Sequence, residues 1–337
     1  MNIYGITREK LEEYFLGIGE KKFKAIQILE WFYQKRVHSF EECSNIKKEV
    51  IERLKRDFSL RLPDIIKREM DGDTEKFLFE LEDKERVEAV LMKHNYGNSL
   101  CVSSEVGCNM GCKFCESGRL KKIRNLKSSE MVGQILQVEK ESGVRISSVV
   151  IMGIGEPLDN YENVIDFIKI INDAKGLAIG ARHITLSTCG IVPKIYELSE
   201  LPLQINLAIS LHAPNDELRS KLMPINKAYP LNELMVAIKD YISKTNRRVT
   251  MEYVLLKGVN DSLEQAIELA KLLRGLNVYV NLIPYNETSH IEFQKSEKKR
   301  IDAFYDALVK QHINVTIRKE FGSKISAACG QLRSKEL

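Results

Sequence analysis

Three of the seven cysteines stand close together, at Cys108, Cys112 and Cys115, in the stretch CVSSEVGCNMGCKFC that covers residues 101–115. Thiolates are the preferred protein ligands of iron–sulfur clusters, and a loop this short can bring three sulfurs around one small cluster. Three cysteines leave one iron of a 4Fe–4S cluster without a protein ligand, open to a substrate or cofactor. Gly107 and Gly111 suit such a loop, because glycine lets the chain turn sharply.

Two other uses of clustered cysteines fit the sequence less well. The N-terminal stretch MNIYGITREKLEEYF carries charge where a secretory signal needs an apolar core, which argues against disulfides. A structural zinc usually takes two pairs of ligands, whereas the cysteines at 43, 101, 189 and 329 are isolated. No apolar run approaches the ~18 residues that span a bilayer. We therefore expect a cytoplasmic protein with no membrane partner.

The charge of the chain permits a polyanionic partner without demanding one. The formal net charge is +4 and the isoelectric point is about 8.5. Basic residues gather in five short groups, at residues 21–24, 35–36, 47–48, 53–56 and 119–124. These groups are read equally well as solvated helix faces and as contacts to the phosphates of a nucleic acid.

The elements that must position these residues fall into three parts. Residues 1–62 show apolar side chains at helical spacing over 8–15, 22–36 and 46–58, which predicts a small, basic helical domain. Residues 63–98 form a linking region with a predicted β-hairpin, because apolar and polar side chains alternate over 77–81 and 87–92. The third part runs from residue 99 to 337. A length of 337 residues agrees with about two domains.

In the third part, six strands each precede a helical stretch, which indicates a parallel sheet with right-handed crossovers. The strands are predicted at 99–103, 147–152, 183–187, 204–211, 249–256 and 278–283, with a further one at 314–318. No G-x-G-x-x-G follows the first strand, which disfavours a dinucleotide-binding domain. We predict an α/β fold, a partial (β/α)6 barrel, with the helical domain at its N-terminus.

In a barrel the chemistry gathers at the carboxyl ends of the strands. The polar residues expected there are Glu156 in GIGEP, Ser187, the Ser210–His212 segment and Asn286. The Glu156 carboxylate could accept hydrogen bonds from an ammonium group, although an ordinary turn explains GIGEP as well. Cys329, in AACGQLR, lies outside any periodic element, where its thiol could reach a site made by strand ends, whereas an isolated cysteine is more often a buried apolar residue.

The spacing C-x3-C-x2-C resembles the cluster loop of radical S-adenosylmethionine (SAM) enzymes, whose open iron is chelated by the amino and carboxyl groups of SAM. A wider set of motifs, in order and over nearly the whole chain, resembles the radical-SAM adenine methyltransferases of 23S rRNA, the RlmN/Cfr family. The motifs are CVSSEVGCNMGCKFC, RNL at 124–126, MGIGEP, LST at 186–188, SLHAP at 210–214, RSKLMPIN at 219–226, GVND at 258–261, NLIPYN at 281–286 and AACGQL at 327–332. The chain differs from the usual family sequence at 116–122 and at 324–326.

The resemblance implies a role for each candidate residue. Cys108, Cys112 and Cys115 would hold one 4Fe–4S cluster. Cys329 would carry the methyl group, Cys101 would be the resolving cysteine, and Glu88, in VEAV, would accept a proton. The residues implied to contact SAM are Gly155, Glu156, Ser187, Ser210, Leu211, His212 and Asn286.

The resemblance also implies a mechanism that uses two SAM molecules per turnover, because an aromatic C–H carbon of adenine is a poor nucleophile. The first SAM methylates the Cys329 thiolate. Reductive cleavage of the second SAM gives a radical that removes hydrogen from the S-methyl group, and the resulting methylene radical adds to the adenine. After loss of an electron and a proton, Cys101 attacks the sulfur of Cys329, which forms a disulfide and releases methyladenine.

The function implied is methylation of carbon 2 of an adenine in 23S rRNA, at the peptidyl-transferase centre, and in some tRNAs. The alternative is the antibiotic-resistance branch, which methylates carbon 8, but Pro157 favours carbon 2 because the carbon-8 branch more often has Ala there. A radical-SAM enzyme on a non-RNA substrate and a non-catalytic RNA-binding protein with a structural metal stay open. We expect a monomer that takes electrons from flavodoxin or ferredoxin.

Overall fold

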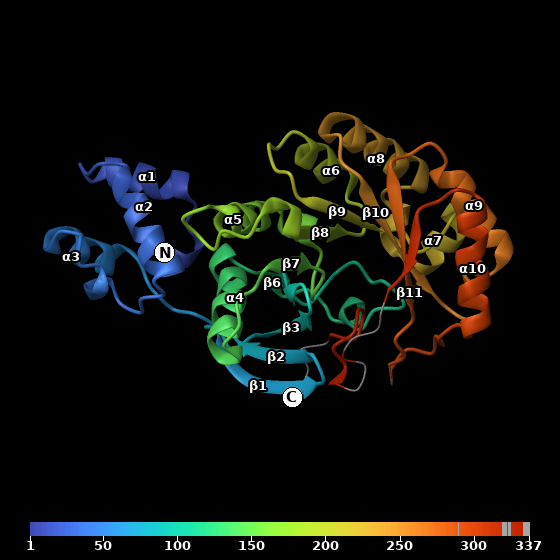
Figure 1. Ribbon diagram of the computed structural model, residues 1–337, viewed down its shortest axis with the longest axis horizontal. Coiled ribbons are helices and arrows are strands. Elements are labelled where there is room, and N and C mark those ends of the chain that lie inside the picture. The colour runs from blue at the N-terminus through green and yellow to red at the C-terminus, as the bar shows by residue number, and fades with distance from the viewer. Residues whose placement is uncertain (289, 319–321, 323–324, 333–337) are drawn as a thin grey trace.

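The computed structural model describes residues 1–288, 290–318, 322 and 325–332, and its central element is a ten-stranded sheet (Figure 1). The strands of this sheet are β1 (Asp64–Asp71), β2 (Thr74–Glu80), β3 (Arg86–His94), β4 (Gly97–Cys101), β7 (Ser148–Ile151), β8 (Ile184–Thr188), β9 (Asn206–Ser210), β10 (Val249–Leu255), β11 (Val278–Pro284) and β12 (Val315–Ile317). A separate small sheet pairs β5 (Glu105–Val106) with β6 (Arg124–Asn125).

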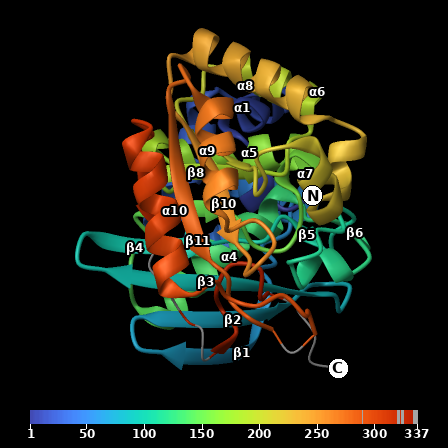
Figure 2. The same cartoon turned by 90° about the vertical axis from the view of Figure 1, so that its right-hand side faces the viewer.

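From β4 onward the strands are parallel and lie in chain order, β4-β7-β8-β9-β10-β11-β12. Helices pack on the outer side of this curved sheet (Figures 1 and 2). They are α4 (Ser128–Ser142), α5 (Tyr161–Asn172), α6 (Val192–Ser199), α7 (Asp216–Leu222), α8 (Leu231–Thr245), α9 (Leu263–Leu273) and α10 (Lys298–Lys310). No ladder joins β12 to β4 in the part of the chain described, so the barrel is partial. The predicted α/β fold is confirmed.

The predicted hairpin is also present, since β2 and β3 pair antiparallel. Two further pairings were not predicted: β1 adds to the outer side of β2, and β3 pairs with β4, so the sheet is continuous from the hairpin into the barrel. The strand β1 escaped prediction because it is an edge strand whose side chains alternate only between exposed and half-buried, with charges along it. The domain boundaries at 62/63 and 98/99 stay predictions.

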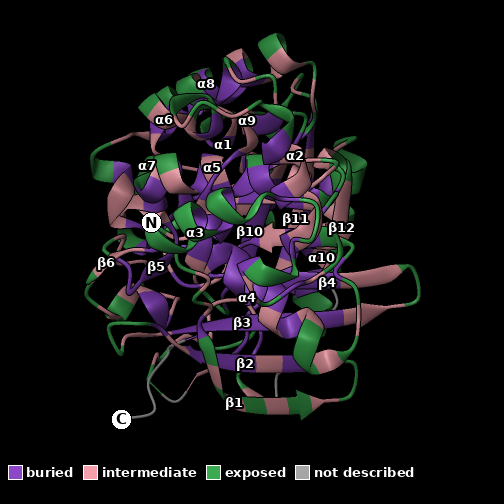
Figure 3. Cartoon of the chain, turned by 90° about the vertical axis from the view of Figure 1, so that its left-hand side faces the viewer, coloured by how far each residue is buried: buried purple, intermediate pink, exposed green. Residues whose placement is uncertain are grey.

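The N-terminal part contains the three expected helices, α1 (Arg8–Gly17), α2 (Phe23–Leu29) and α3 (Lys48–Asp57), and α2 continues into a π-helical turn over Glu30–Gln34. This part lies against α4 and α5, and buried, half-buried and exposed residues alternate along its helices (Figure 3). Arg8 pairs with Asp173 at the end of α5, and the Ser128 hydroxyl of α4 donates to the Gly5 carbonyl at 2.9 Å.

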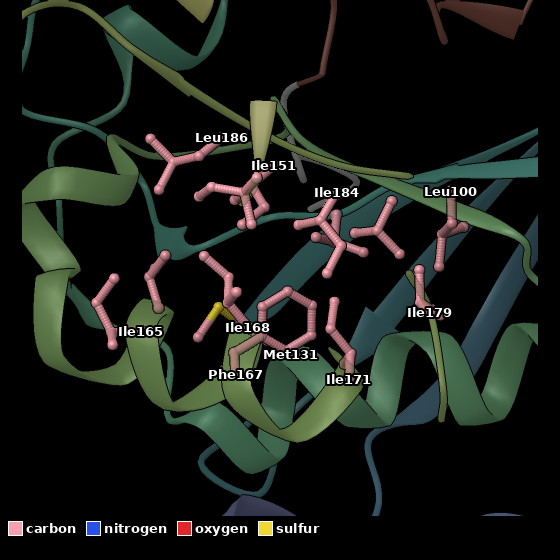
Figure 4. Packing of buried hydrophobic residues seen from close by; sticks show 14 of the residues in the cluster. Leu100, Met131, Ile151, Ile165, Phe167, Ile168, Ile171, Ile179, Ile184 and Leu186 are labelled. Carbon is pink, nitrogen blue, oxygen red and sulfur yellow. The ribbon is translucent and has the colours of Figure 1, made fainter. Parts of the chain in front are cut away.

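The core between the helices and the barrel strands is made of aliphatic side chains with a few aromatic ones. Figure 4 shows Phe167, Ile168 and Ile171 of α5 facing Ile184 and Leu186 of β8, all fully buried. Strands covered on both sides are apolar along their length, which is why the sequence predicted them as continuous apolar runs. No helix of the described residues is both long and apolar enough to cross a membrane.

Candidate active site

The cysteine loop follows β5 and wraps around one end of a central cavity. Gly107 and Gly111 both have left-handed backbones, with φ of 76° and 67°, which confirms the reason for expecting glycine there. A Cβ at Gly107 would lie 2.2 Å from the Lys121 carbonyl oxygen, so this position accepts no side chain. The Cys108 N–H donates to the Leu120 carbonyl at 3.0 Å, which closes the loop on itself.

The central cavity lies at the carboxyl ends of β7 to β11, where a barrel is expected to hold its chemistry. The residues that line it come from segments far apart in the chain, between Cys108 and Gly330. The predicted site residues that line it are Cys108, Cys112, Cys115, Gly155, Glu156, Ser187, Ser210, His212, Asn286 and Cys329. The side chain of Leu211 is instead fully buried in the hydrophobic core, so its implied contact with SAM would involve its backbone.

The loop after β7 presses against the segment that follows β4. A Cβ at Gly153 would lie 2.7 Å from the Val102 carbonyl oxygen, and one at Gly155, where φ is 109°, would meet the side chain of Glu105 at 2.6 Å. Glu105 in turn accepts a hydrogen bond from the Glu156 N–H at 2.9 Å. Glycine is therefore required in this loop so that its backbone can approach the cavity wall.

Glu156 is buried at the floor of the cavity. Its carboxylate accepts hydrogen bonds from the backbone N–H groups of Leu158 at 3.0 Å and Cys189 at 2.8 Å, and the side chains of Thr188 and Cys189 also hydrogen-bond to it. Burial raises the pKa of the Glu156 carboxyl above its ordinary value, despite these donors. No side-chain cation among the described residues pairs with it, and a bound ammonium group would stabilise its ionised form.

His212, at the end of β9, has a left-handed backbone with φ of 57°, an uncommon conformation that clusters at functional sites. Its Nδ1 accepts a hydrogen bond from the Val254 N–H at 3.0 Å, which leaves Nε2 as the N–H donor. Phe114 of the cysteine loop packs edge-on against the imidazole ring, with centroids 4.7 Å apart. Burial lowers the pKa of His212 to about 3, so the ring is neutral at physiological pH.

The sequence did not single out Arg219 of α7, which is fully buried and holds two of the strand ends in place. Its guanidinium donates to the carbonyls of Cys189 at 2.7 Å, Leu211 at 3.2 Å and Ser210 at 3.3 Å. A fourth hydrogen bond reaches Oδ1 of Asn226 at 2.8 Å. Arg219 and Asn226 are the first and last residues of the motif RSKLMPIN, and this motif was the only feature of the sequence that could have pointed to them.

A second cavity adjoins the first and brings the two implied catalytic cysteines together. Cys101, at the end of β4, and Cys329 both line it, and Cys329 lines the central cavity as well. The pKa of the Cys101 thiol is raised to about 12, mainly because the thiol is buried and to a smaller extent because Cys329 is near. The expectation that the Cys329 thiol reaches the strand ends agrees with this placement.

Glu88 does not line either cavity. It lies on β3, two residues before Val90, which is the register partner of Cys101. Side chains alternate between the two faces of a strand, so Glu88 is on the same face of β3 as Val90 and Met92, which line the second cavity. Its carboxylate pairs with Lys76 at 3.3 Å. Its role as proton acceptor stays a prediction.

Two further charged residues that the sequence did not indicate line the cavities. Arg318, directly after β12, lines both of them, and the thiol of Cys329 is the main influence that raises the pKa of its guanidinium. Glu252 of β10 lines the central cavity and accepts a hydrogen bond from Asn281 at 2.8 Å. Charged residues usually mark surfaces in a sequence, so the position of these two on cavity walls could not be foreseen.

The donor set fits a 4Fe–4S cluster with SAM beside it. Cys108, Cys112 and Cys115 share one cavity with the buried Glu156 carboxylate, which has no side-chain cation as a partner among the described residues. The described residues contain no group of three or more His, Cys, Asp or Glu side chains arranged around a single ion, but in a cubane cluster each cysteine binds its own iron. Two stretches, 116–122 and 324–326, differ from the usual family sequence. In the second of them, Lys324 lies outside the described residues.

Comparison with known proteins agrees with the motifs. Residues 102–270 match the model of the radical SAM superfamily, and residues 1–60 match that of the ribosomal RNA large subunit methyltransferase N-terminal domain. The chain is 54% identical over 338 residues to the probable dual-specificity RNA methyltransferase RlmN of Acholeplasma laidlawii, with 100% of each chain covered. It is 55% identical over 345 residues to the protein of the same name from Enterococcus faecalis, with 100% of this chain and 97% of that one covered.

A solved structure is similar over the same extent. The crystal structure of a radical SAM methyltransferase from Sphaerobacter thermophilus matches with a TM-score of 0.93 and 41% identity, covering 99% of this chain and 100% of that one. The resemblance inferred from the motifs is thereby confirmed. The chain belongs to the radical SAM superfamily and, within it, to the RlmN family of RNA methyltransferases.

Proposed function

We propose that this protein methylates carbon 2 of an adenine in 23S rRNA, at the peptidyl-transferase centre, and an adenine in some tRNAs. The observation that carries the proposal is the position of Cys329, which lines one cavity with the three clustered cysteines and a second with Cys101. Membership of the radical SAM superfamily implies a 4Fe–4S cluster and SAM as cofactors. When bound, this pair supplies the one-electron chemistry that activates a methyl C–H bond.

The residues of the chain would position and bind the groups that react. Cys108, Cys112 and Cys115 would hold the cluster, and the buried Glu156 carboxylate would accept hydrogen bonds from the SAM ammonium group. The protonated Nε2 of His212 would donate a hydrogen bond inside the cavity. Gly155, Ser187, Ser210, Leu211 and Asn286 are the other proposed SAM contacts, and the close packing of Gly155 on Glu105 supports a backbone contact there.

The two isolated cysteines would carry the transferred carbon. The Cys329 sulfur takes a methyl group from the first SAM, and that carbon, after loss of one hydrogen atom, bonds to the adenine ring. Glu88 would then remove the proton from the ring carbon, and the ring would return one electron to the oxidised cluster, which restores its aromaticity. When the Cys101 thiolate attacks the Cys329 sulfur, an S–S bond forms, the C–S bond to the product breaks with its electron pair on carbon, and that carbon takes up a proton as methyladenine leaves.

The partners follow from this reaction. An electron-donor protein such as flavodoxin or ferredoxin would reduce the cluster, and the substrate RNA places the reaction in the cytoplasm; the proposed active form is a monomer. The exposed lysines of the N-terminal part, Lys21, Lys22 and Lys48, have no carboxylate partner among the described residues and are suited to bind phosphates.

The test of the proposal is nucleoside mass spectrometry after an anaerobic reaction of the reconstituted protein with SAM, a reductant and a transcript of the peptidyl-transferase hairpins. 2-Methyladenosine and 8-methyladenosine serve as chromatographic standards. A 2-methyladenosine peak is the expected result. An 8-methyladenosine peak would assign the protein to the carbon-8 reaction. The reaction is repeated with tRNA, and SAM cleavage without any methylated adenosine in either RNA would refute RNA as the substrate.

The role of the N-terminal lysines has its own test. The double substitution Lys21→Glu/Lys22→Glu is expected to weaken RNA binding about tenfold or more at low salt, because it replaces two cations by two anions. Acidic side chains suit the start of α2, so the helix should stay folded. Lys239→Glu on the exposed side of α8 is the control. Equal RNA affinity for the two variants would rule out this role.

A further inference from the structure

A cleft lies on the outer side of the cysteine loop and carries a group of basic side chains. Four basic residues line it: Lys113 and Arg119 from the loop itself, Lys257 from the turn after β10, and His290. Glu292 is the only acidic residue in its wall within the described part of the chain. The cleft shares no lining residue with either of the two cavities that contain Cys329.

Two of these side chains, Lys113 and Arg119, keep their positive charge available to a partner. Lys113 is exposed, and its ammonium group makes no ion pair with any described residue. The guanidinium of Arg119 donates to the backbone carbonyl of His290, a neutral acceptor that leaves its charge uncompensated. Lys257 does have an acidic neighbour, Glu297, at 3.1 Å. His290 lies 3.5 Å from the Glu116 carboxylate. The cations of the wall that have no acidic partner among the described residues are therefore Lys113 and Arg119, and these two favour an anionic partner.

The cleft is separated from the proposed cluster by the thickness of one loop. Lys113 lies between Cys112 and Cys115, which line the central cavity on the other side of that loop. The next residue, Phe114, points into the cavity and contacts His212. Adjacent residues of the loop therefore face opposite sides, Lys113 toward the outer cleft and Phe114 toward the inner cavity.

We propose that this cleft is the docking site of a small acidic electron-transfer protein of the flavodoxin or ferredoxin kind. The inference rests on the proposed function, because it requires a cluster at Cys108, Cys112 and Cys115. One electron leaves the docked protein, which is oxidised by one electron, and the cluster is reduced by one. Electron-transfer complexes are small and transient, and they depend on opposite charges to raise the rate of encounter.

An RNA phosphate backbone is the other anion that could bind basic residues. The substrate adenine has to reach Cys329, however, and the cleft contributes nothing to the walls of the cavities that Cys329 lines. An electron has no such requirement, since it needs only a short path to the cluster. The position of the cleft behind the cysteine loop therefore favours the electron donor.

The test compares Lys113→Glu and Lys257→Glu with the control Lys169→Glu, an exposed lysine of α5 for which no ion pair with a described residue is found. Lys257 lies outside the cysteine loop, so its variant is informative even if Lys113→Glu impairs cluster assembly. Two quantities are measured with a bacterial flavodoxin: the affinity of its oxidised form for the protein by calorimetry, and the rate at which its reduced form bleaches the visible absorbance of the cluster.

Each cleft variant is expected to lose about tenfold or more in affinity and in reduction rate at low salt, with the difference shrinking at high salt. Reduction by dithionite and binding of RNA should match the control. Unchanged flavodoxin affinity, or a loss confined to RNA binding, would overturn the proposal. Calorimetry measures flavodoxin binding whether or not the cluster is present. A wild-type protein that assembles no cluster would therefore count against the proposed function, and the docking site would still be tested by the binding measurement.

Discussion

The carbonyl oxygen of Gly330 accepts a hydrogen bond from the N–H of Glu116 at 2.8 Å, which ties the residue after Cys329 to the residue after Cys115. A second hydrogen bond joins the same two segments, because the Ser117 hydroxyl donates to the Leu332 carbonyl at 2.7 Å. The loop that carries Cys329 is therefore fastened directly to the cysteine loop. A methyl group on Cys329 would thus be held at a fixed place relative to the proposed cluster.

The side chain of Gln331 stabilises the same loop from within. Its Oε1 accepts a hydrogen bond from the Ala328 N–H at 3.1 Å, and its Nε2 donates to the Glu287 carbonyl at 3.0 Å. We predict that Gln331→Ala slows RNA methylation about fivefold to tenfold, because a net hydrogen bond contributes about 0.5–1.5 kcal/mol to the ordered loop. Single-turnover rates with saturating SAM measure this effect.

Two variants sharpen that measurement. Gln331→Glu keeps an acceptor for the Ala328 N–H but replaces the donor to the Glu287 carbonyl by a negatively charged oxygen, so it should react no faster than Gln331→Ala if the contact to Glu287 is the more important one. Gln311→Ala, on an exposed residue at the end of α10, should have no effect. If Gln331→Ala and Gln311→Ala react at the same rate, the side chain of Gln331 does not order the loop.

Arg219 should be important for stability as well as for the shape of the site. Removing its guanidinium in Arg219→Met takes a donor from the carbonyls of Cys189 and Ser210 and from Oδ1 of Asn226, whereas the Leu211 carbonyl keeps the Ala213 N–H. We expect the free energy of unfolding to fall by about 3 kcal/mol or more, since each buried unsatisfied group costs about 1–3 kcal/mol. Urea unfolding measures it.

Lys221→Met is the matched control, because Lys221 lies on the same helix and pairs with Glu217 at the surface. A surface substitution of this kind should change stability by no more than about 0.5 kcal/mol. Arg219→Met that unfolds at the same urea concentration as Lys221→Met would show that the hydrogen bonds of Arg219 are replaced in the variant.

The parts of the site that the sequence predicted and the parts it missed differ in physical kind. The barrel strands are apolar runs bounded by turns, and the strand-end rule then identifies Glu156, Ser187 and His212 without any knowledge of contacts. Arg219 and Arg318 have no such signature, because an arginine that is buried or lines a cavity looks the same in one sequence as an arginine at the surface. The approach of Cys329 to Cys101 depends on how the C-terminal loop folds back, which no local pattern encodes.

His212 should make the stability of the protein depend on pH. Its pKa is about 3 in the folded chain, against an ordinary value of 6.5, so the unfolded chain binds the extra proton between these values. Stability from the neutral ring is thus fully present above pH 6.5 and is lost as the pH falls toward 3. At pH 5 the loss is about 2 kcal/mol, at 1.36 kcal/mol per pH unit.

His212→Asn removes this titration, so the measurement is the difference in unfolding free energy between wild type and variant at several pH values. The difference isolates His212 from Glu156 and Glu252, whose raised pKa values act in the opposite direction, toward greater stability as the pH falls. A difference that stays constant from pH 7 to pH 5 would mean that the ring is solvated in solution.

The pair of cysteines at the second cavity leads to the most specific prediction. Cys101→Ala should form a covalent adduct between RNA and protein through Cys329, because the thiolate that we propose releases the product is missing. Burial raises the pKa of the Cys101 thiol, so release in the wild type should accelerate with rising pH, whereas adduct formation in the variant should not depend on that ionisation. Labelled RNA on a denaturing gel detects the adduct.

The controls separate the two thiols from the other cysteines. Cys101→Ala/Cys329→Ala should give no adduct, since the attachment point is gone. Cys43→Ala, a fully buried cysteine of the N-terminal core, should turn over and release methylated RNA. If Cys101→Ala consumes SAM under turnover conditions and no adduct forms, the cavity shared by Cys101 and Cys329 is not where product release takes place, and another residue must resolve the Cys329 intermediate.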